Sequence, residues 1–215
     1  MNLLLYKEFR LAIHPLFGLV SLFGLLLLIP HWPYPFAMMY IFYITVPNAF
    51  VAAKAQNDLG FTVMLPVRKR DVVGARVVSF ATLEVLNVLV AALVVAVKLV
   101  LHAPGNFLMD ANLAFLGATL AMYGLFNLVF FPMFYRTAYK LGIPLLVASF
   151  VAAVFAFSIE AISAVVPGAS RWLDGSAPDD LVRQLPILAA GILAFAALTG
   201  LASTTAGKRF ERLDL

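Results

Sequence analysis

The chain has 215 residues, of which 63% are hydrophobic and 12% are charged, and its mean hydropathy is +0.98. This composition is too apolar for a soluble domain of this size and indicates an integral membrane protein. The net charge of +4 would suit nucleic acid, but the basic residues lie at the ends of apolar segments, so we expect no nucleic-acid partner. The absence of cysteine excludes disulfides and thiolate metal sites.

Six segments are long and apolar enough to cross a lipid bilayer, since a helical span needs about 20 apolar residues. They are residues 15–33, 35–53, 77–101, 111–135, 143–166 and 185–206. We therefore expect an all-α membrane protein with six transmembrane helices, forming a single transmembrane domain over residues 1–215.

The residues before the first span, 1–14, are predicted to form an interfacial helix. Lys7, Arg10 and His14 fall on one helical face, which would lie on the inner leaflet. A cleaved signal peptide is the alternative, but no A-x-A site follows the apolar run.

A polar loop, residues 54–76, follows the second predicted span. Asn57 can cap a short helix there, and Pro66 can end it. The apolar face of this helix would consist of Phe61, Met64 and Leu65. A helix of about two turns is shorter than the ~12 to 15 residues that are stable alone in water, so this face needs a surface to dock on.

Basic residues follow the short helix at Arg68, Lys69 and Arg70, where they would face anionic headgroups or a partner. Asp71 comes next and suits the first turn of the following helix, because its charge complements the positive end of the helix dipole.

The order of two spans, this loop and a third span resembles the bacterial ABC-2 type permeases. Within that family the chain is similar to the small six-span permeases related to phenol-soluble modulin exporters. The residues that match the family's loop pattern are Asn57, Asp58, Leu65, Pro66, Val67, Lys69, Arg70, Asp71 and Arg76. Arg68 departs from the pattern, since the family usually has a Ser or Thr that caps the next helix.

The resemblance implies that the loop is a cytosolic coupling helix, which sits in a groove on a separate ATP-binding subunit. The expected docking residues are Asn57, Asp58, Phe61, Met64, Leu65, Pro66, Arg68, Lys69 and Arg70. It also implies a homodimer with two ATP-binding subunits, which bind ATP and Mg. The expected function is export of an amphipathic peptide, lipid-like or drug-like substrate across the bacterial plasma (inner) membrane.

The positive-inside rule predicts the orientation of the spans. The basic residues that fall on one side are Lys7, Arg10, Lys54, Arg68, Lys69, Arg70, Arg76, Arg136, Lys140, Lys208, Arg209 and Arg212. That side should be cytosolic, together with both termini. Lys98 lies near the outer end of its span and is predicted to extend outward to the interface.

Three features leave alternatives open. Pro47 lies inside the second span and predicts a kink, either for packing or as a hinge. A stripe of small residues in the fourth span fits a contact within the subunit or a dimer seam, and consists of Ala114, Gly117, Ala121 and Gly124. The outer segment 167–184 contains Ser176, Pro178, Asp179 and Asp180, which suit a short external helix, or it is a solvated loop.

No catalytic motif is complete in the chain. The run from Gly200 to Arg209 places six residues between its glycines and lacks the Ser or Thr of a phosphate loop, so we expect the ATP site in another polypeptide. The histidines at 14, 31 and 102 are too far apart to predict a metal site. A membrane enzyme is therefore disfavoured, and a non-transporting membrane scaffold or sensor coupled to an ATPase is the alternative to a transporter.

Two carboxylates lie inside predicted spans, where a charge is costly without a partner or a role. Glu84 lies about two turns into the third span, one turn before Asn87, and Glu160 lies near the outer end of the fifth. We expect these three residues to line a transport path or gate, with static hydrogen bonding between helices as the structural alternative.

Overall fold

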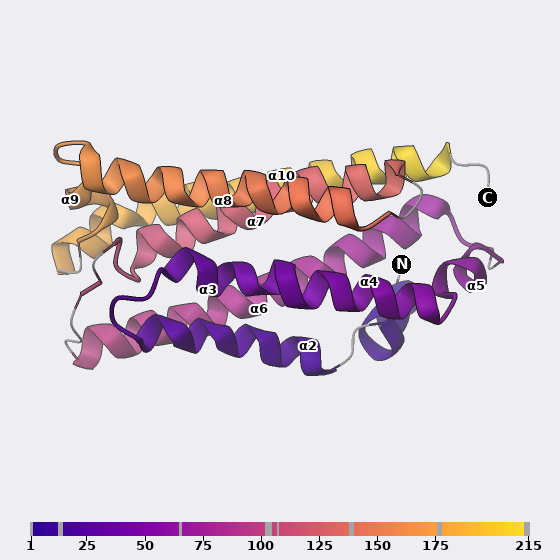
Figure 1. The fold of residues 1–215 in the computed structure, drawn as a ribbon, viewed down its shortest axis with the longest axis horizontal. Coiled ribbons are helices and arrows are strands. Elements are labelled where there is room, and N and C mark those ends of the chain that lie inside the picture. Colours follow the sequence, from indigo (N-terminus) through magenta and orange to yellow (C-terminus); the bar gives the residue numbers. More distant parts are fainter. Residues whose placement is uncertain are drawn as a thin grey trace.

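The computed structural model describes residues 2–12, 15–64, 66–101, 105–106, 108–137, 140–175 and 178–212. These residues form helices and turns, and no strand occurs among them. The helices run lengthwise beside one another (Figure 1). Helix α1 (Asn2–Lys7), helix α5 (Asp58–Met64) and the end of α10 (Pro178–Glu211) lie at one end, called the α5 end below. Helix α9 (Ser170–Leu173) lies at the opposite end, the α9 end.

The first apolar segment combines two helical pitches. Helix α2 (Pro15–Val20) continues as the 3₁₀ helix η2 (Ser21–Leu28). Because a 3₁₀ helix rises about 2.0 Å per residue and an α-helix about 1.5 Å, the two together extend roughly 25 Å, slightly less than a hydrocarbon core of about 30 Å. Asn87 donates to the Ser21 carbonyl oxygen at 3.3 Å, which helps to satisfy this irregular segment.

The second apolar segment is interrupted by a π-helical turn. Helix α3 (Tyr34–Tyr40) passes through η3 (Ile41–Thr45) into α4 (Val46–Ala55), and Pro47 lies in the first turn of α4. Proline has no N–H to donate, so a regular hydrogen-bond ladder cannot continue through it. The Asn48 side chain donates to the Ile44 carbonyl oxygen at 2.7 Å and so supplies a nearby donor.

Five helical segments are long and apolar enough to cross a membrane, among the residues described. They are Tyr34–Ala55, α6 (Lys69–Leu101), α7 (Leu113–Arg136), α8 (Gly142–Val165) and most of α10. The first apolar helix, Leu16–Leu28, is shorter. Helix η1 (Glu8–Ala12) continues α1 with π-helical geometry.

Two of the long helices begin before the apolar spans that they contain. Helix α6 begins at Lys69 and carries Asp71 in its first turn, and α10 begins at Pro178 with Asp179 and Asp180 in its first turn. Both acidic first turns agree with the helix-dipole expectation. The helix start predicted at Pro178 is thus the start of the last span, and α9 is the separate short helix of the outer segment. Ser176 lies outside the described residues.

Helix α7 forms the centre of the bundle and packs against α6, α8 and α10. Phe42 stacks on Phe126 with ring centroids 3.7 Å apart, and Phe50 lies over Phe134 at 4.4 Å. All four rings are buried. Aromatic pairs of this kind add about 0.5–1.5 kcal/mol beyond the burial of their area.

The small-residue stripe of α7 is a contact within the subunit. A Cβ on Gly117 would lie 2.7 Å from the Ile187 carbonyl oxygen, and a Cβ on Gly124 would lie 3.1 Å from the Phe195 Cα. Both neighbours belong to α10. The stripe therefore brings two backbones of one chain together, as small residues do between membrane helices.

Large apolar side chains cover the outside of the bundle. Five that are more than half exposed are Leu89 and Leu93 of α6, Leu146 and Phe150 of α8, and Leu193 of α10. An apolar exterior of this extent fits a hydrocarbon environment, as the composition predicted.

Candidate functional site

Helix α5 has a buried polar face and an exposed apolar face. Asp58 and Thr62, one turn apart, point inward, and Thr62 is 1% exposed. Phe61 is 60% exposed and Met64 is 80% exposed. The predicted apolar face is therefore open to a partner at these two residues, while Leu65 lies outside the described residues.

The backbone turns sharply just before α5. Asn57 has a φ of 49°, in the left-handed region that asparagine tolerates better than most residues, and its amide N–H donates to the Lys54 carbonyl oxygen at 3.1 Å. Its side chain lies against Gly60, where a Cβ would come 2.7 Å from Oδ1. Glycine at this position lets the turn and the helix start fit together.

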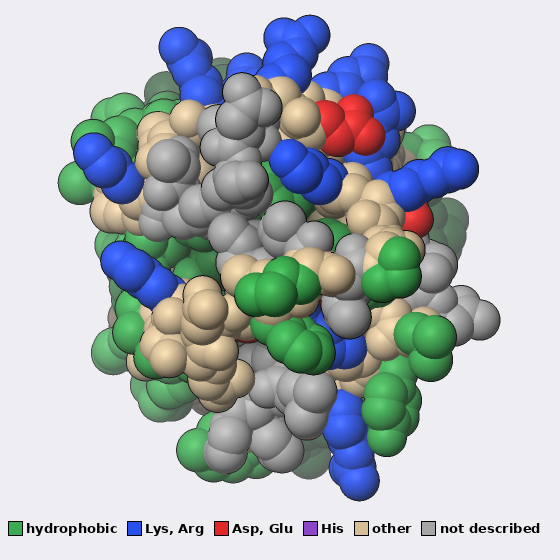
Figure 2. Space-filling view, turned by 90° about the vertical axis from the view of Figure 1, so that its right-hand side faces the viewer, with side chains coloured by type: hydrophobic (Ala, Val, Ile, Leu, Met, Phe, Trp, Pro, Cys, Tyr) green, Lys and Arg blue, Asp and Glu red, His purple; other side chains and the backbone are tan. Residues whose placement is uncertain are grey.

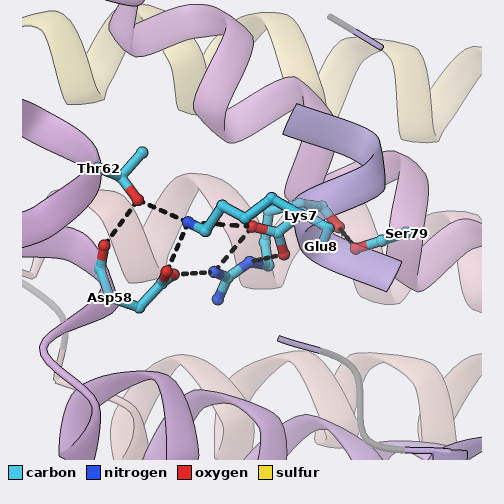
Figure 3. A network of polar contacts seen from close by, with 6 residues as sticks. Lys7, Glu8, Asp58, Thr62 and Ser79 are labelled. Atoms are coloured by element: carbon cyan, nitrogen blue, oxygen red, sulfur yellow. Dashed lines mark hydrogen bonds and ion pairs between the residues drawn. The ribbon is translucent and has the colours of Figure 1, made fainter. Parts of the chain in front are cut away.

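A cluster of four charged side chains lies behind α5 (Figure 3). Arg76 of α6 lies between two carboxylates: its Nε is 2.5 Å from Glu8 Oε2, and its Nη2 donates to Asp58 Oδ2 at 2.7 Å. Lys7 Nζ is 2.5 Å from Asp58 Oδ1 and donates to Thr62 Oγ1. The cluster therefore joins three segments that are far apart in the sequence.

The cluster is balanced in charge and shielded from water. Lys7 and Arg76 face Glu8 and Asp58, and the exposed fractions of these four side chains are 2–15%. Thr62 closes the network by donating to the Asp58 carbonyl oxygen at 2.6 Å. Because a seven-residue helix does not hold together alone, this buried polar anchor keeps α5 helical while its apolar face stays exposed.

The N-terminal helix supports the cluster from the other side. Leu4 is buried against Val72 and Ala75 of α6, while Leu3 and Tyr6 are exposed. Lys7, which was predicted to share one helical face with Arg10 and His14, pairs with the Asp58 carboxylate in the cluster. Arg10 is exposed, as expected, and His14 lies outside the described residues.

Basic side chains crowd the α5 end. Figure 2 shows this face, where Lys and Arg predominate over Asp and Glu and apolar side chains lie near the centre. Pro66 and Arg68 are exposed. Lys69 Nζ lies 5.7 Å from the centre of the Phe210 ring, and Arg70 pairs with Glu211 at 2.7 Å. Arg70 thus has a partner within its own chain.

Glu84 lies in a buried polar network in the middle of the bundle. It is 2% exposed, and Asn127 of α7 donates to its Oε2 at 2.7 Å. The same Asn127 amide donates to Thr199 Oγ1 of α10 at 3.2 Å. Burial agrees with the argument that a lipid-facing carboxylate would be costly, and the contacts join three helices.

Asn87 belongs to a neighbouring part of this network. Its Oδ1 lies 2.6 Å from the Tyr123 hydroxyl, which also lies 2.9 Å from the Met38 carbonyl oxygen. Asn87 and Tyr123 are both buried. A role of Glu84 or Asn87 in the transport path stays a prediction.

A second charged region lies toward the α9 end. Lys98 is 7% exposed and donates to Asp110 Oδ1 at 2.8 Å and to the Tyr34 hydroxyl at 3.0 Å. Lys98 thus reaches toward the α9 end, where the segment before α7 brings Asp110 over it. The Asp110 N–H donates to Asp174 at 2.5 Å. Burial raises the pKa of Asp174 above its usual value, that hydrogen bond opposes the shift, and the Asp110 carboxylate adds to it.

Glu160 lies close to this region but contacts a different group. The Met109 N–H donates to its Oε2 at 2.8 Å, and the side chain is 5% exposed. Glu84 and Glu160 thus do not meet in one site. The candidate residues fall into three places: the α5 end, the Glu84 network and the Glu160 region.

Sequence reasoning missed Glu8, Lys98 and Tyr34 as members of buried polar clusters. Their partners lie 12 to 68 positions away, so no local spacing could reveal them. Among the described residues, no three His, Asp or Glu side chains form a group that could hold a metal ion.

These features define a multi-pass helical membrane protein with a small amphipathic helix anchored at one end. The family model described as ABC-2 family transporter protein matches residues 3–203, nearly the whole chain, and the chain belongs to that family. It is a permease subunit of an ABC transporter and pairs with an ABC-type ATP-binding subunit. No curated protein and no solved structure gave a significant match.

Proposed function

We propose that this permease exports an amphipathic peptide, lipid-like or drug-like substrate, and that α5 is the helix through which its ATP-binding subunit acts. The observation that carries the proposal is the two-sided structure of α5. Phe61 and Met64 are exposed on one side, while Asp58 and Thr62 fasten the other side to α6 and the N-terminal helix. A rigidly held helix can transmit a push from the partner into the membrane helices.

The orientation that fits this role places the α5 end in the cytosol. Basic residues gather there, and α1 and the last turns of α10 lie at the same end, so both termini would be cytosolic (Figure 2). The membrane would be the bacterial plasma membrane. ATP and Mg would bind in the partner subunit, and we propose no cofactor in this chain.

A homodimer with two ATP-binding subunits is the proposed assembly. The polar centre of a single copy is filled by side chains of its own helices, as the enclosed Glu84 network illustrates. Helices α8 and α10 leave most of their apolar length exposed, which provides surface for a second copy. A path for an amphipathic substrate would then form between two copies.

The proposal is tested by co-expressing the chain with an ABC-type ATP-binding subunit encoded beside it and reconstituting the complex in proteoliposomes. Export predicts ATP-dependent movement of an amphipathic peptide or lipid probe, which is lost when the Walker lysine of the partner is replaced. If the complex assembles and hydrolyses ATP but moves none of a broad probe set, the scaffold or sensor alternative is favoured.

A further inference from the structure

A small cavity lies between α3, α7 and α8, on the α9 side of the bundle. Its volume is about 20 Å³, which is room for about one water-sized group. Phe115, Met122 and Ile159 supply apolar walls, and Thr119 and Glu160 supply side-chain oxygens. This volume is far below the ~300–1,000 Å³ of pockets for drug-sized ligands, so the cavity suits one small polar group, about the size of a water molecule or an ammonium, and not a whole substrate.

Glu160 contributes a carboxylate with one oxygen unoccupied. Its Oε2 accepts the Met109 N–H at 2.8 Å, whereas no hydrogen-bond partner from the described residues reaches the buried Oε1. The side chain is 5% exposed. A buried polar atom without a hydrogen-bond partner costs about 1–3 kcal/mol, and more if it is charged. A donor that binds at Oε1 would remove that cost.

The surrounding charges favour a cation as that donor. Lys98 is the nearby basic side chain, and it is already held by Asp110 and Tyr34. Asp174 accepts the Asp110 N–H and adds a second carboxylate to the region. Three carboxylates thus lie near one lysine, and the lysine does not reach Glu160.

We propose that the Glu160 cavity binds the ammonium group of an alkylamine-like head group. An ammonium has three N–H donors, and Glu160 Oε1 and the Thr119 hydroxyl oxygen are acceptors in the cavity lining. A bare metal ion is a poorer occupant, because it prefers several oxygen ligands and most of these walls are apolar. This inference rests on the proposed export of amphipathic substrates and narrows their chemistry to cationic head groups.

The helices that line the cavity also carry two exposed aromatic rings. Phe36 and Phe157 neighbour the cavity residues Pro35 and Ala156 in sequence, and their rings lie 5.2 Å apart where α3 meets α8. The two rings are 42% and 36% exposed. They form an apolar seam on the outside of the bundle, against which an alkyl chain can pack.

The test measures binding of radiolabelled octylamine to the purified full-length chain in phosphatidylcholine nanodiscs. We expect saturable binding that octanol does not displace. Glu160→Gln keeps an oxygen for the Met109 N–H but removes the charge, and it should weaken binding at least about tenfold, the effect of losing one charged hydrogen bond. Asp179→Asn removes an exposed charge from the same end and should leave binding unchanged.

Ala156→Val keeps the carboxylate and fills the cavity, so it should also weaken octylamine binding. Thermal unfolding shows whether each variant is folded. If Glu160→Gln is not folded, the comparison of Ala156→Val with the wild type decides the outcome. Equal binding by the wild type and the folded variants, or displacement by octanol, would overturn the inference. Replacing half of the phosphatidylcholine with phosphatidylethanolamine distinguishes the two possible sources of the amine. Weaker octylamine binding identifies the bilayer lipid as the occupant, and unchanged binding identifies an amine from outside the bilayer.

This experiment needs no ATP-binding subunit, so its outcome is independent of whether the assembled complex exports. A chain that binds octylamine through Glu160 in a complex that exports nothing would contradict the proposed function and not the site.

Discussion

Arg76 is the residue on which the α5 anchor depends. It donates hydrogen bonds to both carboxylates of the cluster, Glu8 from the N-terminal helix at 3.1 Å and Asp58 from α5 at 2.7 Å, whereas Lys7 lies 3.8 Å from Glu8. Its guanidinium also lies 5.6 Å from the centre of the Phe50 ring, which belongs to the aromatic core. One planar side chain therefore joins the short helix to the membrane helices.

Arg76→Met should destabilise the chain by about 3–5 kcal/mol, because it leaves two buried carboxylates against the single charge of Lys7. Unfolding of the purified protein in mixed micelles measures this loss. The double variant Arg76→Met, Glu8→Met restores the balance of charge and should lose less than the Arg76→Met single variant. If the stability loss of the double variant equals the sum of the losses of Arg76→Met and Glu8→Met measured alone, the two residues are not energetically coupled and the cluster is not a unit.

Glu84→Gln should keep the stability of the wild type, because a glutamine oxygen can still accept the Asn127 amide. Glu84→Leu should lose about 1–3 kcal/mol, since the Asn127 amide then keeps only its contact to Thr199. The same unfolding assay compares the two variants. Equal stability of Glu84→Leu and wild type would show that the network does not hold the helices together.

At the scale of helices, much of the architecture could be predicted from hydropathy, because length and apolar content determine where a span is possible. The polar extensions are not visible in hydropathy, and it was the acidic residues Asp71, Asp179 and Asp180 that indicated a helix start at both places. Helix α6 begins at Lys69 and α10 at Pro178, since a helix continues as long as its backbone bonds and capping charges permit, whatever its hydropathy. The π and 3₁₀ segments depend on contacts such as Asn48 with Ile44, which tertiary structure decides.

The candidate site could be predicted in part, for the same reason. Periodicity alone indicated the exposed face of Phe61 and Met64. The partners of Asp58 could not be predicted, because Lys7 and Arg76 come from other segments and a buried ion pair has no spacing rule. Asp58 was predicted as a docking residue, and in the structure it pairs with Lys7 and Arg76 of its own chain.

Gly117→Ala should disturb the contact between α7 and α10. The new Cβ would lie 2.7 Å from the Ile187 carbonyl oxygen and 2.8 Å from the Leu188 Cα, and backbone atoms cannot move aside cheaply. We expect a loss of about 1–3 kcal/mol in the unfolding assay. Gly200→Ala is the matched control, because nothing lies within 4 Å of its Cβ, and it should be neutral or stabilise by about 0.4–1 kcal/mol. Equal effects of the two changes would contradict the close α7–α10 packing.

For the whole molecule, the arrangement separates two tasks. The α5 end carries the exposed apolar face of α5 and the basic residues, and the α9 end carries Asp110, Asp174 and the Glu160 cavity. Helices α6, α7 and α10 run between these ends, and the Glu84 network joins all three. Helix α6 holds both Arg76 and Lys98, so under the proposed function it is the helix that connects α5 with the α9 end.

Dimerisation is expected because a single copy fills its own interior. A native mass spectrum of the complex assembled with its ATP-binding subunit should show two copies of this chain and two of the partner. One copy of the chain in the intact, ATP-hydrolysing complex would contradict the proposed assembly.

The central claim is that the ATP-binding subunit docks on the exposed face of α5, and the most direct measurement of it is ATPase stimulation by docking variants. Phe61→Asp with Met64→Asp places two charges on this face without touching the ion cluster, and Trp172→Asp makes a similar change at an exposed position of the α9 end. We predict that the double variant stays folded but no longer co-purifies with the partner, and that its stimulation of the partner's ATPase activity falls at least about tenfold. Trp172→Asp should keep both co-purification and stimulation. Normal co-purification and normal stimulation by the double variant would contradict the account.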